Sequence, residues 1–255
     1  MEKSSSVSAQ RLAQRRGDYG FDAPSVVISS ILVGLVMLVL GLLSLLRWRS
    51  RILGIIGLLY SVCSLLSGVS YIYTTRRGKF QVWAELLSSL HLCGDEQILD
   101  LGCGRGAVLL MAAAFLKEGK ATGVDIWKSS DQSGNASSAT WKNAEREGVA
   151  ERVDLYTADM QQLPFANNSF DLVLSSLAIH NIPQRAGRYK ALDEAVRVLK
   201  AGGRLIIADV FETQRYAEHL GELGMINVTH RMLDWRFWYG SPWFMTKLVK
   251  AAKPS

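Results

Sequence analysis

The chain has 255 residues, of which 49% are hydrophobic and 20% charged. This is enough for one full-sized domain with an additional segment, and it excludes a disordered polypeptide. The three cysteines are too few and too scattered for a disulfide framework or a structural zinc site. The net charge of +6 comes from the first 79 residues, because residues 80–255 carry a net charge of −1. A nearly neutral main domain does not suit a nucleic-acid partner, and we expect none.

Two long uncharged segments, residues 23–46 and 52–75, follow one another near the N-terminus. Each would form a helix of about 36 Å, enough to cross a hydrocarbon core of about 30 Å. Buried core helices or a cleaved signal peptide would be the alternatives, but two such segments in succession favour two transmembrane helices. Only five residues separate them, so we expect an antiparallel hairpin with spans at about 25–46 and 52–73. Small residues spaced along both segments favour close helix packing, although the serines could merely be tolerated there. They are Gly34, Gly41, Gly54, Gly57, Ser61, Ser64, Ser67 and Ser70.

Basic residues flank the two predicted spans unequally. Three lie in the short loop, and seven lie in the basic arm 1–22 or just after the second span. These seven are Lys3, Arg11, Arg15, Arg16, Arg76, Arg77 and Lys79. The excess predicts an integral membrane protein with both termini and the following domain in the cytoplasm. It also predicts contact with anionic lipid headgroups, and Trp48, Tyr71 and Tyr73 fall near span ends, where amphipathic rings prefer to lie.

From residue 76 to residue 255, short apolar runs alternate with amphipathic stretches. The expected strands are residues 97–101, 121–126, 153–156, 170–175 and 204–210. The expected helices are residues 80–90, 107–117, 137–147 and 189–199. This alternation predicts an α/β domain with a doubly wound parallel sheet. Ligands of such sheets bind outside the carboxyl ends of the strands, so the residues there are the candidates for chemistry.

A glycine-rich turn, ILDLGCGRG at residues 98–106, directly follows the first expected strand and opens a helix. Glycine permits backbone conformations that let a ligand approach the main chain. Taken alone the turn is ambiguous, because Gly102, Gly104 and Ala107 also fit the spacing of a dinucleotide-binding loop.

The turn resembles the first motif of class I S-adenosylmethionine-dependent methyltransferases, in which an acidic residue stands two positions before the first glycine. Four further stretches resemble later motifs of that family in order and spacing. They are residues 123–125, 158–165, 169–173 and 199–205. The resemblance covers roughly residues 95–210. It implies a Rossmann-like class I methyltransferase fold, with S-adenosylmethionine as cofactor and S-adenosylhomocysteine as product.

The resemblance also implies roles for individual residues. Asp100 would hold the methionine ammonium group, with the Gly102 and Gly104 backbone against the methionine portion. Asp125 would accept the ribose hydroxyls, and Asp159 would accept the adenine amino group. The remaining cofactor contacts would come from Ile126 or Trp127, Met160 and Ser175. Read without the resemblance, each aspartate could equally be a helix cap or a turn residue.

A proton acceptor follows the fourth expected strand, where this family lines the methyl-transfer site. The unperturbed pKa of histidine suits proton abstraction at neutral pH, so His180 is the candidate base, and Asn181 would orient the acceptor. A helix-capping histidine is the alternative for His180. We expect no metal site.

Two other segments could shape the site. The Ser-, Gly- and Asn-rich residues 128–140 could fold over its mouth as a lid or form a solvated loop. Aromatic residues crowd residues 235–244, where we expect mostly core around the last strands. Some of these rings could instead line an apolar acceptor pocket or rest on the membrane interface.

Together these features predict a membrane-anchored methyltransferase that acts on a small or lipophilic acceptor. The attacked atom, whether O, S, N or C, stays open, as does the oligomeric state. A small-thiol S-methyltransferase at the membrane is one alternative. A non-catalytic S-adenosylmethionine-binding membrane protein, acting as a sensor or scaffold, is an alternative of another class. The expected partners are therefore a small-molecule or lipid-like acceptor and the lipid bilayer.

Overall fold

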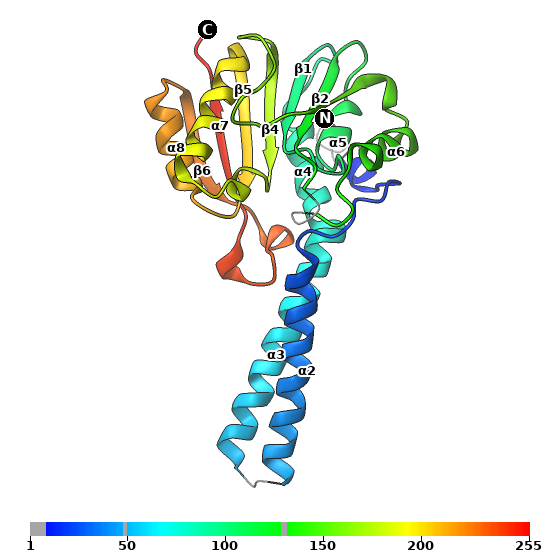
Figure 1. The fold of residues 1–255 in the computed structure, drawn as a ribbon, viewed down its shortest axis with the longest axis vertical. Helices are drawn as coiled ribbons and strands as arrows, with labels where there is room; N and C mark the ends of the chain where they lie inside the picture. Colours follow the sequence, from blue (N-terminus) through cyan, green and yellow to red (C-terminus); the bar gives the residue numbers. More distant parts are fainter. Residues whose placement is uncertain (1–8, 48–49, 129–131) are drawn as a thin grey trace.

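The computed structural model describes residues 9–47, 50–128 and 132–255. A mixed seven-stranded sheet, covered by helices on both faces, stands on a two-helix hairpin (Figure 1). Trp48 and Lys3, which the sequence analysis assigned to the membrane flanks, lie outside the described residues.

The sheet has the strand order β3-β2-β1-β4-β5-β7-β6. Its strands are β1 Gln97–Leu101, β2 Lys120–Asp125, β3 Val153–Thr157, β4 Phe170–Ser176, β5 Leu199–Asp209, β6 Ile226–Met232 and β7 Lys247–Ala252. The first five are parallel, and β7 runs antiparallel between β5 and β6. The predicted parallel sheet is thus confirmed, and an antiparallel edge completes it. β5 begins five residues earlier than expected, because Leu199 pairs with Phe170 ahead of a register shift.

Helices cover both faces of the sheet. α4 Lys79–Ser88, α5 Leu109–Ala113 and α6 Ser137–Glu147 contribute to one buried apolar cluster, and α7 Arg185–Val198 and α8 Thr213–Glu222 contribute to the other. Successive residues of a strand face opposite sides, so Ile98 belongs to the first cluster and Leu99 to the second. The helix expected over residues 107–117 is α-helical only in α5. A short 3-10 turn, η2 Ala150–Arg152, precedes β3.

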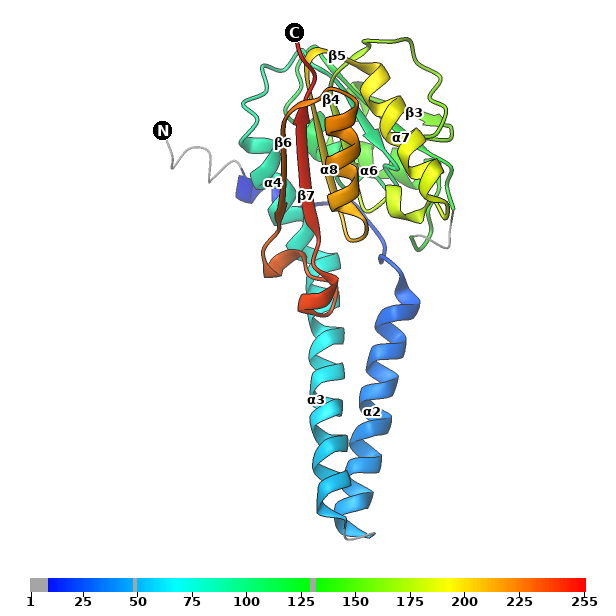
Figure 2. The same ribbon diagram turned by 90° about the vertical axis from the view of Figure 1, so that its left-hand side faces the viewer.

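The hairpin consists of α2 Pro24–Leu46 and α3 Arg51–Tyr73, which project together from the domain (Figures 1 and 2). Both helices are long and apolar enough to cross a membrane, and only 17% of each most apolar stretch is buried. The expected small-residue contact is present. A side chain at Gly41 would lie 3.0 Å from the Leu58 nitrogen and 3.1 Å from the Gly54 carbonyl oxygen. Ser64 also donates a 2.8 Å hydrogen bond to the Ser30 carbonyl of the other helix.

No break separates the hairpin from the domain within the described residues. α3 passes through a π-helical turn, η1 Thr74–Gly78, directly into α4, which gives a helix of 38 residues. The domain boundary expected at residue 76 therefore falls inside a continuous helix.

The aromatic segment expected to be mostly core instead forms a loop beside the hairpin, between β6 and β7. It contains two 3-10 turns, η4 Trp235–Phe237 and η5 Pro242–Phe244. Phe237 is fully buried, but Trp243 is 87% exposed. The Trp238 carbonyl accepts a 2.6 Å hydrogen bond from the Thr74 hydroxyl. Trp235, Trp243 and Phe244 are thus exposed, whereas Phe237 lies in the core and Tyr239 packs against it.

Candidate active site

The glycine-rich loop crosses the carboxyl end of β2. The N–H groups of Gly102 and Cys103 donate to the Val124 carbonyl at 2.8 and 3.1 Å. Gly102 has a φ of +69°, and a Cβ there would lie 2.2 Å from the Cβ of Ala178. Only glycine fits this position, and it brings the loop backbone close to the segment that follows β4.

Asp125 ends β2 and holds this loop. One carboxylate oxygen accepts from the Gly104 N–H at 2.8 Å. The other accepts from the Trp127 N–H at 2.6 Å and from the Asn135 amide at 3.3 Å. Asp125 is buried, so these hydrogen bonds compensate for its lost hydration.

Asp100, near the end of β1, is only 1% exposed, and its Oδ1 has no hydrogen-bond partner among the described residues. Burial raises the pKa of Asp100 to about 8. A hydrogen bond from the Leu109 backbone opposes this shift, and the charge of Asp125 adds to it. A buried carboxylate oxygen without a partner indicates a site for a donor from a ligand.

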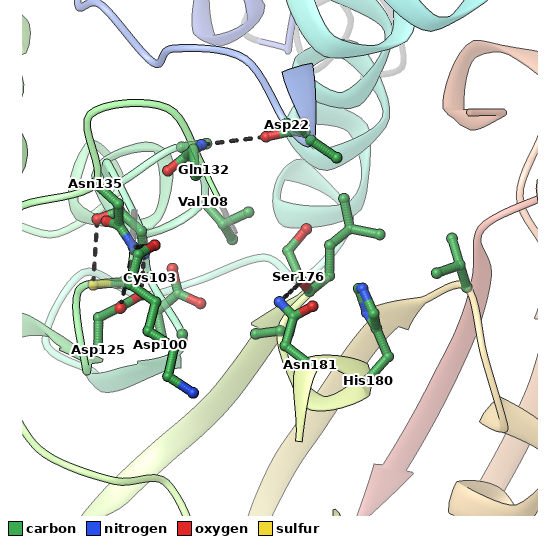
Figure 3. A pocket seen from close by; sticks show the side chains of 18 of the residues that line it. Asp22, Asp100, Cys103, Val108, Asp125, Gln132, Asn135, Ser176, His180 and Asn181 are labelled. Atoms are coloured by element: carbon green, nitrogen blue, oxygen red, sulfur yellow. Dashed lines mark hydrogen bonds between the residues drawn. The ribbon is translucent and has the colours of Figure 1, made fainter. Parts of the chain in front are cut away.

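One cavity of about 590 Å³ gathers nine of the ten predicted site residues (Figure 3). They are Asp100, Gly102, Gly104, Asp125, Ile126, Asp159, Met160, His180 and Asn181. Figure 3 shows Asp100 and Asp125 facing His180 and Asn181 across the cavity. The volume is typical of a small-molecule site.

Ser175, the tenth predicted site residue, does not line this cavity in the described structure. It is fully buried, and its hydroxyl donates to the Leu101 carbonyl of β1 at 3.1 Å. The next residue, Ser176, lines the cavity instead and accepts a 2.9 Å hydrogen bond from the Trp83 indole N–H. Neighbouring residues of a strand face opposite sides of the sheet. A prediction that is wrong by one residue therefore names a side chain that points away from the cavity.

Asp159 lies in an exposed turn after β3. Its carboxylate accepts from the Gln161 backbone N–H at 2.9 Å and from the Gln161 amide at 3.1 Å. The turn therefore presents Asp159 beside Met160 at the cavity wall.

His180 lies in a 3-10 turn, η3 Ile179–Asn181, beyond β4. Its Nδ1 is 2.5 Å from a carboxylate oxygen of Asp209, and its backbone N–H donates to the other oxygen at 3.1 Å. Asp209 is fully buried and also accepts from the Val210 N–H at 2.7 Å. A carboxylate at Nδ1 selects the tautomer in which Nε2 carries the lone pair. Asp209 was not among the predicted site residues, although it stands near the carboxyl end of the fifth expected strand.

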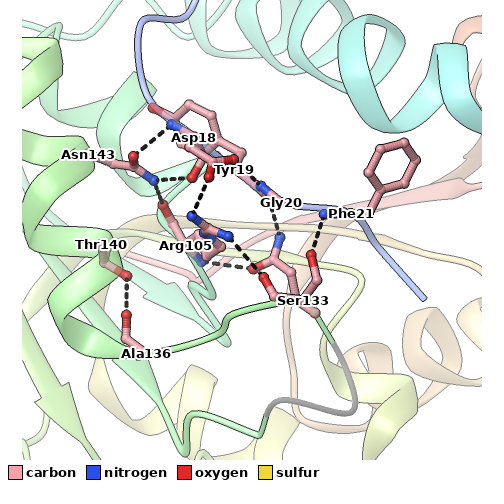
Figure 4. A network of polar contacts seen from close by, with 10 residues as sticks. Asp18, Tyr19, Gly20, Phe21, Arg105, Ser133, Ala136, Thr140 and Asn143 are labelled. Carbon is pink, nitrogen blue, oxygen red and sulfur yellow. Dashed lines mark hydrogen bonds and ion pairs between the residues drawn. The ribbon is translucent and has the colours of Figure 1, made fainter. Parts of the chain in front are cut away.

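The N-terminal arm lies across the cofactor loop (Figure 4). The Arg105 side chain contacts the Asp18 carboxylate at 2.9 Å and the Ser133 carbonyl at 2.9 Å. The Arg105 backbone N–H donates to the Gln132 side chain at 2.9 Å, and the Asn143 amide bridges the Asp18 and Arg105 carbonyls. The arm and the described residues of segment 128–140 thus cover the loop together. Residues 129–131 of that segment lie outside the described part.

The other end of the cavity reaches the hairpin, and apart from Tyr239 and Phe244, two rings of the segment 235–244, no residue there was predicted for the site. It is lined by Asp22, Val26, Tyr71, Lys79, Phe80, Trp83, Tyr239 and Phe244. Lys79 is only 5% exposed, and its ammonium lies 2.7 Å from the Asp22 carboxylate. Arg15 is likewise buried, 3.4 Å from Glu147. Neither is therefore the free membrane-flanking charge that the sequence analysis counted. The sequence did contain one further signal for this end of the site: Lys79 and Trp83 are four residues apart, which places them on one face of a helix.

A parallel sheet with a glycine loop after β1 and acidic residues near the ends of β1 and β2 resembles the class I S-adenosylmethionine-dependent methyltransferase domain. Residues 99–207 match the family model described as "Methyltransferase domain". The cofactor of this domain is S-adenosylmethionine. The unpartnered Asp100 oxygen, beside the glycine loop and inside the cavity, fits its charged ammonium group.

Similar proteins agree with this assignment. The chain is 31% identical over 169 residues to the sterol 4-C-methyltransferase strm-1 of Caenorhabditis elegans, covering 62% of this chain and 47% of that protein. It is 32% identical over 160 residues to the ubiquinone/menaquinone biosynthesis C-methyltransferase UbiE of Roseobacter denitrificans, covering 61% and 59%. The chain thus spans about half the length of these relatives.

A solved structure shows the same fold. The geranyl diphosphate C-methyltransferase of Streptomyces coelicolor A3(2), in complex with Mg²⁺, geranyl diphosphate and S-adenosylhomocysteine, has a TM-score of 0.54 at 15% identity. The match covers 68% of this chain and 77% of that one.

Proposed function

We propose that this chain is a membrane-anchored methyltransferase that transfers the methyl group of S-adenosylmethionine to a small lipophilic acceptor. One observation carries the proposal: a single cavity extends from the cofactor loop to the ends of both hairpin helices, where Val26 and Tyr71 line it. Named relatives support the acceptor class, since they are a sterol and a quinone-pathway methyltransferase. The acceptor then reaches the cofactor from the side of the domain that faces the membrane.

The hairpin supports membrane anchoring through its exposed surface. Of the thirty large apolar side chains that are exposed in the described structure, twenty belong to α2 or α3. Helices that are apolar all round are stable in lipid rather than in water. The described start of the chain, the domain and the C-terminus lie at the same end of the hairpin (Figures 1 and 2). The exposed Arg76 and Arg77 beside this end favour a cytoplasmic location.

In the proposed site the cofactor supplies an electrophilic methyl group, and the chain supplies alignment. Asp100 binds the methionine ammonium and Asp125 the ribose hydroxyls, while Asp159 and Met160 hold the adenine end. Fixing cofactor and acceptor in one cavity lowers the barrier by several kcal/mol, because their relative motion is lost before the reaction.

His180 is the proposed general base, and Asn181 orients the acceptor. A nucleophile that carries a proton gives it to Nε2 of His180. The resulting imidazolium is stabilised by the buried Asp209 carboxylate at Nδ1. Asp209 is therefore a positioning residue, and the attacked atom stays open among O, S, N and C.

The test uses the full chain in lipid nanodiscs, with S-adenosylmethionine and a panel of lipophilic phenols, lipophilic amines and small thiols. We expect S-adenosylhomocysteine to form with a lipophilic acceptor and not in the Asp125→Ala control. Turnover on thiols alone would replace the proposal by a small-thiol S-methyltransferase. Cofactor binding without turnover on any acceptor would favour a sensor or scaffold.

A further inference from the structure

The hairpin end of the cavity holds a partly buried polar cluster whose centre is Asp22. Its carboxylate accepts from the Lys79 ammonium at 2.7 Å and from the Tyr239 hydroxyl at 2.9 Å, both at Oδ2. The Gln132 amide donates to Oδ1 at 3.2 Å, and Figure 3 shows this contact at the edge of the cavity. Three segments that are distant from Asp22 in the sequence therefore converge on its carboxylate.

Lys79 is not saturated by this cluster. An ammonium group has three N–H donors, and the described residues give Lys79 one hydrogen-bond acceptor, Asp22. Its ammonium also lies 5.4 Å from the centroid of the Phe80 ring. Two donors of a nearly fully buried cation are thus available to a molecule in the cavity that Lys79 lines.

The surroundings define the occupant that would suit these donors. Aromatic side chains form the wall on this side: Phe80, Trp83, Tyr239 and Phe244. Lys79 and Asp22 together have no net charge, so a carboxylate or phosphate on Lys79 would be repelled by the neighbouring Asp22 carboxylate. An uncharged oxygen accepts from the ammonium without that repulsion.

We propose that Lys79 binds an uncharged oxygen-bearing head group, a hydroxyl or carbonyl, on an otherwise apolar acceptor. This inference rests on the proposed function and names the acceptor class of the same site. Asp22 and Tyr239 hold the ammonium in place. The apolar body of the acceptor lies against the aromatic wall, toward Val26 and Tyr71 at the top of the hairpin.

The test measures equilibrium binding to the full chain in lipid nanodiscs, with empty nanodiscs correcting for partition into lipid. Three probes share one alkyl chain: 4-octylphenol has the neutral oxygen, octylbenzene has none, and 4-octylbenzoate is charged. We expect 4-octylphenol to bind roughly tenfold to a hundredfold more tightly than octylbenzene, as for a hydrogen bond to a charged group. It should also bind more tightly than 4-octylbenzoate.

Lys79→Met should abolish the preference for 4-octylphenol over octylbenzene and leave S-adenosylmethionine affinity unchanged. Because that change leaves Asp22 without a counter-ion, Asp22→Asn/Lys79→Met is the second variant, with the same expected result. Lys120→Met is the matched control. This half-exposed lysine is the first residue of β2, at the amino ends of the parallel strands, whereas the cavity lies at their carboxyl ends.

A preference that persists in both lysine variants, or equal binding of 4-octylphenol and octylbenzene to the unaltered chain, would overturn the inference. Tightest binding of 4-octylbenzoate would also overturn it, because an anion site would then be present. The proposed function fails separately, if the unaltered chain methylates nothing in the acceptor panel whatever its binding preference.

Discussion

The buried Asp100 carboxyl predicts an unusual pH dependence of cofactor binding. With a pKa of about 8, raised by burial, Asp100 is mostly protonated at pH 7 in the cofactor-free protein. Binding the methionine ammonium as an ion pair requires the carboxylate, so a proton must leave. The apparent Kd should then exceed its limiting value about 2-fold at pH 8, about 11-fold at pH 7 and about 100-fold at pH 6. Above pH 8 the cofactor's own amino group loses its proton, so affinity should be greatest near pH 8.

Calorimetric titration with S-adenosylmethionine at pH 6, 7 and 8, in two buffers of different ionisation enthalpy, measures both the affinity and the proton release. Asp100→Asn is the comparison, because an amide is neutral at every pH and should remove the steep dependence below pH 8. A flat affinity from pH 6 to pH 8 in the unaltered chain, or the same slope in both proteins, would refute the assignment of Asp100.

The same shift has a consequence for stability. The folded-state pKa of Asp100 lies above the unfolded value of about 3.9, so the folded protein binds this proton more tightly. Its contribution to the free energy of unfolding is therefore complete below about pH 4 and is lost as the pH rises through about 8. Urea unfolding of the cofactor-free protein should show this decline, and Asp100→Asn should lessen it.

Four further results are expected. Asp125→Ala should weaken S-adenosylmethionine binding by about 1.5–3 kcal/mol, as for lost hydrogen bonds to a charged group, and unchanged affinity in a folded variant would remove Asp125 from the site. His180→Ala should lower kcat by about 10²–10⁴ with cofactor affinity retained, and should remove the limb of the rate that rises with pH, since only neutral imidazole accepts a proton. If the rate of His180→Ala still rises with pH, the ionising group belongs to the acceptor. Asp209→Asn should also lower kcat. A protein beginning at Arg76 lacks the arm over the cofactor loop and should bind S-adenosylmethionine more weakly by calorimetry; equal affinity would show that the arm does not help to close the site.

The parallel core of the domain could be predicted because its signals are local. The carboxyl end of each of the five expected strands lies within two residues of the observed end. A short apolar run bounded by turns is typical of a buried parallel strand. The edge of the sheet that carries the site followed from the parallel strands, which place their carboxyl ends at one edge, whereas the cofactor residues there followed from the family resemblance. Asp209 also lies at the carboxyl end of a parallel strand, but it was not predicted because it belongs to no recognised motif.

Apart from the aromatic rings of residues 235–244, the hairpin side of the cavity could not be predicted, since it depends on contacts between distant segments. The Tyr19 hydroxyl donates to Glu147, 128 residues further along, at 2.9 Å. Asp22 contacts Tyr239 across 217 residues. In the sequence these groups look like a solvated basic arm, and Lys79 looks like a membrane-flanking charge. Their burial becomes visible only when the fold brings their partners to them.

These contacts bear on whether the hairpin only tethers the domain. Burying an ammonium group costs several kcal/mol unless it is paired, so the Asp22–Lys79 pair resists separation of the segment that leads into α2 from the start of α4. α3 reaches α4 without a break, so the second hairpin helix is rigidly continuous with a helix of the domain core. Both hairpin helices therefore enter the domain through residues that line the cavity. A shift of one relative to the other must change the shape of the cavity, which favours a hairpin that builds part of the acceptor site over one that acts as a flexible anchor.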